Sequence, residues 1–416
     1  MPLPAALASF RIRSFRFQWP SDLLTSWAFE MEMLILGWYV LVETKSVVLL
    51  TLFASLFYIG TLVAPIFGTL GDRFGQRTVL FGTRGTYMTM AAVMTTLALS
   101  GLLQPVYVFI IAAFTGFVRP SDIGVRSALV ASTVPSEYLV GSMSLSRMTA
   151  DSARGMGALL GSGLFVAFGM GPSYLVITSF YLMGALLLFG TGPELRQARD
   201  IVAGGPPRPS AWRELVAGMS YIWNTPRLFA LMWLAFLVNL AAFPLVTGLM
   251  PYIAKDIYHT NQTGLGWLVF SIACGALTGS VALSVIGNRL RVDRIMLGSI
   301  VTWFAMLLIF AHVTDMSVGI VCLLVIGCMQ SVSMVTLAII LMQTAEPQYR
   351  GRVMGVRMMA IYGHPVGMLA AGVLVARIGY PATATLYGVI GLVFTLAIVL
   401  FWRSEMWPRR AEVSEA

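Results

Sequence analysis

Charged residues are scarce in this 416-residue chain, where they make up 11% of the sequence, against roughly 25% in ordinary soluble domains. Hydrophobic residues make up 58%, and the mean hydropathy is +0.82. A soluble core cannot bury that much apolar surface, so these values exclude an ordinary soluble globular protein. We expect most of the chain to lie in lipid.

Residues for enzymatic chemistry are also few. The three histidines stand far apart, and the three cysteines lie inside predicted helices without metal-ligand spacing. The sequence contains no Gly-x-x-x-x-Gly-Lys phosphate-binding motif. We therefore expect no enzyme, no metal site, no cofactor and no use of ATP. The three histidines are His259, His312 and His364, and the three cysteines are Cys274, Cys322 and Cys328.

About twelve apolar stretches are long enough to cross a bilayer as helices, which takes about 20 residues each. The strands of a membrane barrel would alternate apolar and polar residues, and these long unbroken runs do not. The sequence predicts an all-α membrane protein with about twelve transmembrane helices in two six-helix bundles. The predicted spans lie near residues 17–42, 46–70, 78–101, 105–129, 139–168, 172–190, 227–250, 263–286, 294–312, 316–342, 352–377 and 381–402.

The net charge of +9 reflects arginines placed between the predicted helices, which argues against a nucleic-acid partner. Most of these basic residues fall on one side of the predicted membrane, with Lys45, Lys255 and Arg377 on the other. The basic side is cytoplasmic by the positive-inside rule. An even number of spans then places both termini in the cytoplasm.

A polar segment rich in glycine and proline divides the predicted helices into two sets. We predict an N-terminal bundle over residues 1–191, a cytoplasmic linker with a short interfacial helix over 192–226, a C-terminal bundle over 227–403 and a cytoplasmic tail over 404–416. The alternative for the interfacial helix is that it forms the polar start of the seventh span. Two related halves are the expected design of an alternating-access carrier.

The loop between the second and third predicted spans resembles the signature of the major facilitator superfamily, apart from Gln76, where a basic residue is usual. The resemblance implies the major facilitator fold and a cytoplasmic gate held by Asp72 and Arg73, with the helix near Arg350 as the candidate partner. The alternative is a solvated turn. The matching residues are Gly68, Gly71, Asp72, Arg73, Gly75 and Arg77.

Two further stretches, which begin at Arg213 and Arg350, resemble the enterobactin and macrolide efflux branch of this superfamily. That resemblance implies a monomeric secondary transporter of a bacterial inner membrane, which exports amphipathic small molecules such as siderophores or drugs in exchange for protons. The alternatives are an importer, a facilitator or a lipid mover of the same fold. The expected partners are a small-molecule substrate, protons and membrane lipid.

Ionisable residues inside predicted spans are costly and are therefore candidates for function. Glu30 lies past the midplane of the first span and is, with Asp151 and Asp122, a candidate for proton coupling. The other charges of the N-terminal half form a candidate intramembrane network, which either rigidifies the bundle or takes part in titration. Its residues are Glu32, Arg119, Arg126, Arg147 and Arg154.

The C-terminal half has fewer charges within its spans. Polar side chains that could line a substrate cavity there are Asn239, Gln330, Arg357 and His364. His364 precedes Pro365, and proline kinks a helix because its nitrogen carries no hydrogen. The alternative for His364 is a packed core residue.

Overall fold

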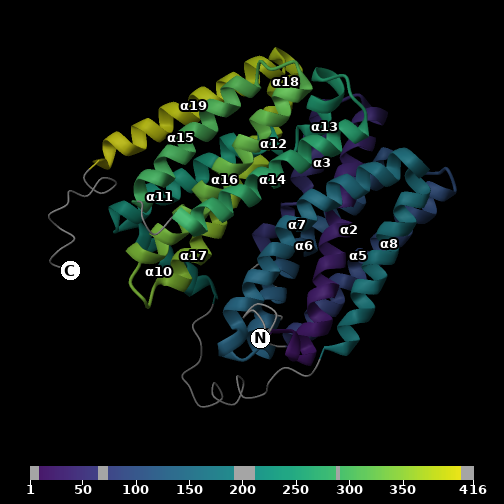
Figure 1. The fold of residues 1–416 in the computed structure, drawn as a ribbon, viewed down its shortest axis with the longest axis horizontal. Coiled ribbons are helices and arrows are strands. Elements are labelled where there is room, and N and C mark those ends of the chain that lie inside the picture. The colour runs from purple at the N-terminus through teal and green to yellow at the C-terminus, as the bar shows by residue number, and fades with distance from the viewer. Residues whose placement is uncertain (1–8, 64–73, 192–210, 287–290, 404–416) are drawn as a thin grey trace. The chain divides into compact units, whose positions relative to one another are not determined.

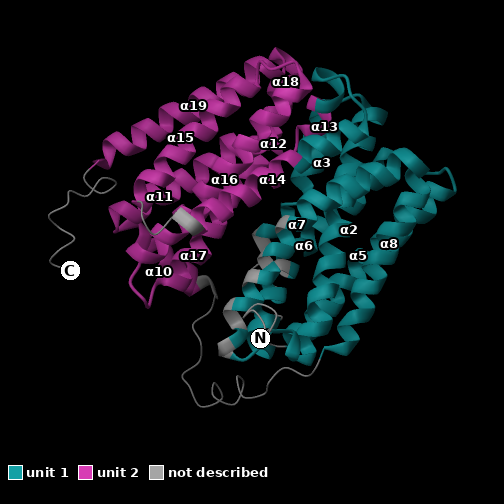
Figure 2. Ribbon diagram, in the orientation of Figure 1, with its two compact units in different colours: residues 1–208, 254–270 teal, residues 209–253, 271–416 magenta. Residues whose placement is uncertain are grey.

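The computed structural model describes residues 9–63, 74–191, 211–286 and 291–403. Within these residues the chain is helical and contains no β-strand (Figure 1). It divides into two units, residues 1–208 with 254–270 and residues 209–253 with 271–416 (Figure 2). Helix occupies most of the described part of each predicted span, which confirms the all-α prediction.

Unit 1 is built around one long helix, α2 (Arg13–Thr44), which packs against the helices α3, α6, α7 and α8. Lys45, at φ +50°, ends α2, and Ser46 caps the next helix by accepting a hydrogen bond from the Leu49 amide at 3.3 Å. The other elements are η1 (Ser9–Arg11), α3 (Val47–Leu56), η2 (Ile59–Val63), α5 (Gln76–Leu99), α6 (Pro105–Thr133), α7 (Ser136–Phe168), α8 (Met170–Leu187) and η3 (Leu188–Gly190).

Two glycines set the distance between α7 and α2. A Cβ atom at Gly157 would lie 2.9 Å from the Cβ of Glu30, and one at Gly161 would lie 3.0 Å from the Cα of Met31. Small residues let helix backbones approach closely in membranes. The backbone around Glu30 therefore packs directly against α7.

Unit 2 contains helices that are interrupted by irregular turns. Its elements are α10 (Ala211–Trp223), α11 (Pro226–Leu237), η4 (Val238–Ala242), α12 (Phe243–Val246), α13 (Met250–Tyr252), α15 (Val292–Phe310), α16 (Met316–Thr344), α17 (Arg350–Met359), η7 (Ala360–Tyr362), α18 (Gly363–Ile378) and α19 (Tyr380–Phe401), while η5 (Ile253–Ile257) and α14 (Gln262–Ile286) belong in part to each unit.

The segment η4 is π-helical and lies between α11 and α12. Pro244 follows it and has no N–H to donate to the carbonyl of Leu240, four residues earlier. Gly367 of α18 lies directly against this carbonyl, where any side chain would clash. A second irregular turn, the 3-10 segment η7, precedes His364 and Pro365, close to the predicted kink.

The short helix α10 is separate from α11 and packs against α17. The ring of Tyr221 stacks on that of Tyr349 with centroids 4.1 Å apart, and its hydroxyl accepts a hydrogen bond from the Glu346 amide at 3.2 Å. Val216 and Trp223 leave an apolar face of α10 exposed. An exposed apolar face is what the predicted interfacial helix requires, and its place at the membrane surface stays a prediction.

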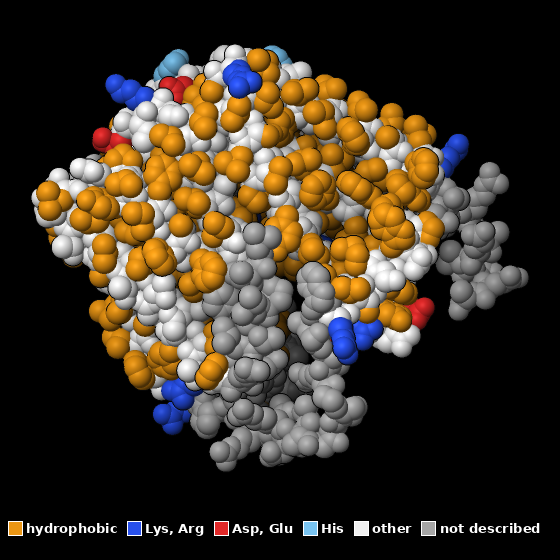
Figure 3. Space-filling view, turned by 180° about the vertical axis from the view of Figure 1, so that it is seen from behind, with side chains coloured by type: hydrophobic (Ala, Val, Ile, Leu, Met, Phe, Trp, Pro, Cys, Tyr) orange, Lys and Arg blue, Asp and Glu red, His pale blue; other side chains and the backbone are white. Residues whose placement is uncertain are grey.

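Among the described residues, eight helical stretches are long and apolar enough to span a membrane. The helices α2, α5 and α7 are 32, 24 and 33 residues long and carry buried or half-buried charges. Hydrophobic side chains cover much of the described surface, and Lys and Arg gather near its upper and lower margins (Figure 3). The protein therefore spans a membrane.

Candidate functional site

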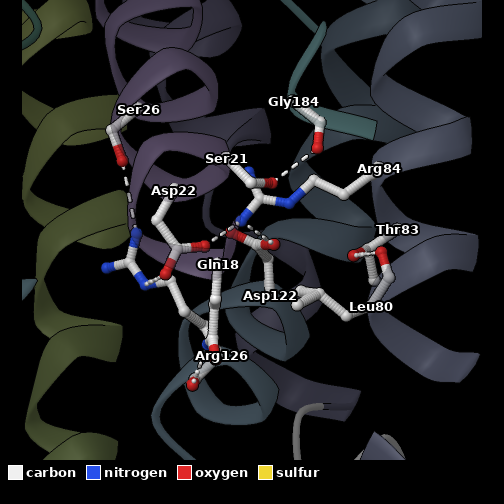
Figure 4. Close-up of polar contacts among 10 residues, drawn as sticks. All are labelled: Gln18, Ser21, Asp22, Ser26, Leu80, Thr83, Arg84, Asp122, Arg126 and Gly184. Carbon is white, nitrogen blue, oxygen red and sulfur yellow. Dashed lines mark hydrogen bonds and ion pairs between the residues drawn. The ribbon is translucent and has the colours of Figure 1, made fainter. Parts of the chain in front are cut away.

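Four charged side chains meet inside unit 1. The carboxylate of Asp22 lies 2.7 Å from a guanidinium nitrogen of Arg84 and 3.9 Å from Nε of Arg126, and Arg84 also lies 3.4 Å from Asp122. Asp22 stands between the two arginines (Figure 4). Two carboxylates and two guanidinium groups balance in charge, which a buried ionic cluster requires.

Hydrogen bonds fix this cluster to the neighbouring backbone. The Gln18 amide donates to the Arg126 carbonyl at 3.0 Å, and Arg126 donates to the Ser26 hydroxyl at 3.2 Å (Figure 4). The side chain of Arg84 is fully buried, and its Nε and Nη1 atoms have no hydrogen-bond partner among the described residues. Arg84 is thus held mainly by its two carboxylates.

A third carboxylate of α2 has a different environment. Glu32 is 1% exposed and accepts hydrogen bonds from the hydroxyl of Tyr181 at 2.9 Å and from that of Tyr174 at 3.4 Å. Both tyrosines belong to α8. Among the described residues, no Lys or Arg forms an ion pair with Glu32.

Glu30 lies on another face of α2 and is half-buried. It forms no hydrogen bond or ion pair with any described residue, but Glu30, Arg119 and Arg154 all lie within electrostatic range of the Tyr58 hydroxyl. The guanidinium of Arg119 stacks over the ring of Phe29, 3.7 Å from its centroid. A cation held on an aromatic face keeps its charge without a fixed carboxylate.

The loop that carries the signature residues from Gly68 to Arg77, the predicted cytoplasmic gate, is described only in part. Gly75 has a φ of +86° and precedes α5, and Arg77 donates to the Phe189 carbonyl at 3.1 Å and approaches that of Leu188 at 3.5 Å. Cations are favourable at the carbonyl end of a helix. The hydrogen bonds of Arg77 therefore connect the start of α5 to the residues that follow α8. The residues Gly68, Gly71, Asp72 and Arg73 lie outside the described residues, as do the side chains of Arg147 and Asp151.

The candidate cavity residues of unit 2 occupy separate elements. Asn239 donates to the Ala235 carbonyl at 2.8 Å, and Arg357 donates to that of Met334 at 3.2 Å. His364 is 2% exposed, and its Nε2 atom lies 3.3 Å from the Thr247 hydroxyl. The buried amide of Gln330 has an Oε1 atom without a hydrogen-bond partner among the described residues.

The structure brings Asp122 and Arg126 into one cluster and places Glu30, Glu32 and Arg119 outside it. The sequence reasoning missed Asp22 and Arg84, although both lie inside predicted spans, where every ionisable residue is a candidate. It also missed the tyrosines at Glu32, because their positions on α8 carry no signal of their own. No group of three or more His, Cys, Asp or Glu suited to a metal occurs in the part of the chain that the structure describes.

Comparison with known proteins agrees with a helical membrane transporter. The chain is 24% identical to the enterobactin exporter EntS of Escherichia coli O1:K1 over 378 residues, which cover 88% of this chain and 86% of that one. It is 26% identical to the multidrug efflux pump Tap of Mycolicibacterium fortuitum over 187 residues, or 44% and 45% of the two chains. The crystal structure of the nucleoside transporter NupG superimposes with a TM-score of 0.73 at 13% identity, covering 94% and 99%.

The sequence model of the Major Facilitator Superfamily matches residues 21–362 and 232–416. The chain belongs to this superfamily, and it is a transmembrane transporter of small molecules. The fold and the family that the loop signature predicts are thereby confirmed.

Proposed function

We propose that the protein is a proton-coupled exporter of amphipathic small molecules, of the siderophore or drug type, which works by alternating access in a bacterial inner membrane. Glu30 carries the proposal. It is a half-buried carboxylate inside a membrane helix that forms no ion pair with any described residue, and Arg119 and Arg154 lie with it within electrostatic range of the Tyr58 hydroxyl. Such a group can gain a proton without leaving a paired cation exposed to lipid.

The relatives support the direction of transport. EntS is an enterobactin exporter and Tap is a multidrug efflux pump, and EntS aligns with most of this chain. NupG is a nucleoside transporter, so the fold itself sets neither substrate nor direction. An importer, a facilitator or a lipid mover of the same fold is the alternative, and substrate-driven proton movement distinguishes it from the exporter.

The proposed substrate contacts lie on helices of unit 2. Gln330 offers a buried carbonyl oxygen with no partner among the described residues, and a substrate N–H or O–H group would satisfy it. Asn239 lies within the π-helical segment η4 and His364 follows the 3-10 segment η7, and such irregular turns are frequent at functional sites. We assign Arg357 to the same proposed cavity, and we assign the cytoplasmic gate to Asp72 and Arg73.

The proposed assembly is a monomer with both termini in the cytoplasm. This orientation follows from the excess of arginine on one side of the predicted helices. Cysteine-accessibility labelling at Arg13, which is exposed at the start of α2, and at Asp315, which is exposed just before α16, tests it in intact cells. Labelling of the Arg13 variant by an impermeant reagent in unbroken cells would contradict the orientation.

Proton exchange in everted vesicles tests the function. Acid-loaded vesicles receive a panel that contains a catechol siderophore, a macrolide and a cationic dye, and a pH-sensitive fluorophore reports loss of the gradient. We expect at least one compound to discharge the gradient with the native protein, and Glu30→Gln to abolish the discharge. Glu43→Gln is the matched control, because Glu43 lies exposed near the end of the same helix.

Each outcome has a definite meaning. Discharge that survives Glu30→Gln removes Glu30 from coupling and leaves Asp122, Asp151 and the Asp22 cluster as candidates. No discharge by any compound, with the protein present and folded, contradicts export of this substrate class. Uptake assays in right-side-out vesicles would then test the importer.

A further inference from the structure

Glu32 is the carboxylate that neither the charged cluster nor the proposed coupling at Glu30 uses. The two glutamates are two residues apart, which turns them about 200° from each other around the helix. Glu32 therefore faces α8, where Tyr174 and Tyr181 contact it, while Glu30 faces Gly157 of α7. Both are at the same depth in unit 1, but Glu32 is 1% exposed and Glu30 is half-buried.

The described polar groups that contact Glu32 are the hydroxyls of the two tyrosines of α8. Tyr87 of α5 packs beside them, with its ring centroid 5.6 Å from that of Tyr181. Tyr87 and Arg84 lie on the same helix, and Tyr87 is within electrostatic range of four charged groups, Asp122, Arg84, Arg119 and Glu32. No described cation forms an ion pair with Glu32 itself.

Arg119 of α6 lies at about the depth of Glu32, where it stacks over Phe29, but it forms no ion pair with Glu32. Asp22 is about 15 Å from Glu32 along α2, at about 1.5 Å per residue. The α7 positions Asp151 and Arg147 precede Gly157 by about 9 Å and about 15 Å along that helix. Gly157 packs at the level of Glu30, so these positions approach the level of Asp22.

A carboxylate with no counter-ion is costly in a dry interior, whereas the neutral acid is tolerated once it is hydrogen-bonded. Tyrosine hydroxyls suit both forms, since each can donate to the carboxylate and can also accept from the protonated acid. An arginine pair, like that at Asp22, stabilises the ionised form alone. The tyrosine pair therefore favours reversible binding of a proton at Glu32.

We propose that Glu32, enclosed by Tyr174 and Tyr181, is a second proton-binding site of this transporter, separate from Glu30. Its use in turnover rests on the proton coupling proposed above, but its binding of a proton does not. In this arrangement the carboxyl O–H donates to one tyrosine oxygen, and the other tyrosine donates to the carboxyl. Deprotonation leaves both tyrosines as donors.

Infrared spectroscopy of the purified full-length protein in detergent tests the site without any substrate. A protonated carboxyl group gives a carbonyl band apart from those of amides and carboxylates. We expect the native protein to show such a band, to lose it reversibly as the pH rises, and to lack it in Glu32→Gln. Tyr181→Phe should shift the band to higher frequency, because one hydrogen bond to the carboxyl group is lost, and Glu43→Gln should leave it unchanged.

Two results would overturn the proposal. If native protein and Glu32→Gln give the same carbonyl bands at every pH, Glu32 binds no proton. If the band persists at every pH at which the protein stays folded, Glu32 is a permanently neutral structural group. Should Glu32→Gln not fold, the Tyr181→Phe shift and the pH titration of the native band decide. An absence of transport in vesicles would not affect these readings, so the two proposals can fail separately.

Discussion

Asp22 and Glu32 lie on one helix and are almost equally buried, at 2% and 1% exposure, yet they are stabilised in different ways. Two guanidinium groups surround Asp22, and two hydroxyls hold Glu32. Guanidinium groups stay charged at any physiological pH, so they favour the ionised form of their partner. The difference separates a carboxylate held by permanent charges from one held by hydroxyls, at which proton binding is proposed.

The largest expected effect comes from removing the central cation. Arg84→Met leaves Asp22 and Asp122 buried with one arginine between them, and breaking a buried pair costs about 3–5 kcal/mol. We expect a matching fall in stability, measured as a much shorter half-life at elevated temperature in detergent. Arg227→Met is the control, because the Arg227–Asp293 pair at 2.6 Å has side chains 27% and 29% exposed, and its loss should cost at most about 1 kcal/mol.

Equal half-lives for these two variants would break the comparison, since the Asp22 cluster would then contribute no more than a partly exposed pair. The double variant Arg84→Met with Asp122→Asn sharpens it. Removing the carboxylate that Arg84→Met leaves uncompensated should restore part of the lost half-life. A further loss instead of recovery would contradict the charge balance of the cluster.

A smaller effect is expected from Asp22→Asn. Arg84 keeps Asp122 at 3.4 Å, and the half-buried Arg126 keeps its bond to Ser26. The loss is then that of charged hydrogen bonds, about 1.5–3 kcal/mol. Thermal inactivation followed by size-exclusion chromatography measures it, and a loss greater than that of Arg84→Met would reverse the predicted order.

The smallest effect is expected from Tyr181→Phe at the other carboxylate. If Glu32 is a neutral acid at the pH of measurement, the variant loses one neutral hydrogen bond, about 0.5–1.5 kcal/mol. Stability curves at acidic and alkaline pH provide the measurement, and the loss should grow at alkaline pH as the carboxylate forms. A constant loss across the whole pH range would show that Glu32 does not change its ionisation.

Hydropathy alone predicts the fold class, because a helix that crosses lipid needs a long apolar run and these runs are continuous. The spacing of four residues between Asp122 and Arg126 also predicts that they share a helix face. The partners Asp22 and Arg84 depend on how α2, α5 and α6 align, which periodicity within one helix does not specify. The sequence does not predict the tyrosines that contact Glu32 for the same reason, since they are neutral residues at ordinary positions in an apolar helix.

Backbone irregularities are the other feature that the sequence predicts poorly. Pro365 suggests a kink, and the structure has the 3-10 segment η7 just before it. The π-helical segment η4 has only Pro244 as a signal, and the predicted span near 227–250 runs through it as one helix. Two other prolines, Pro20 and Pro120, lie within continuous helices, so proline by itself does not locate a break.

The π-helical segment η4 also has a consequence for the register of unit 2. A π turn accommodates one residue more than the same turn of α-helix, and each residue turns a helix by about 100°. Every side chain after Ala242 is therefore rotated relative to the start of α11, including Thr247, which meets His364. The extra residue thus sets the direction in which the later side chains point. A chain one residue shorter in this turn would keep its hydrophobic span but point Thr247 away from His364.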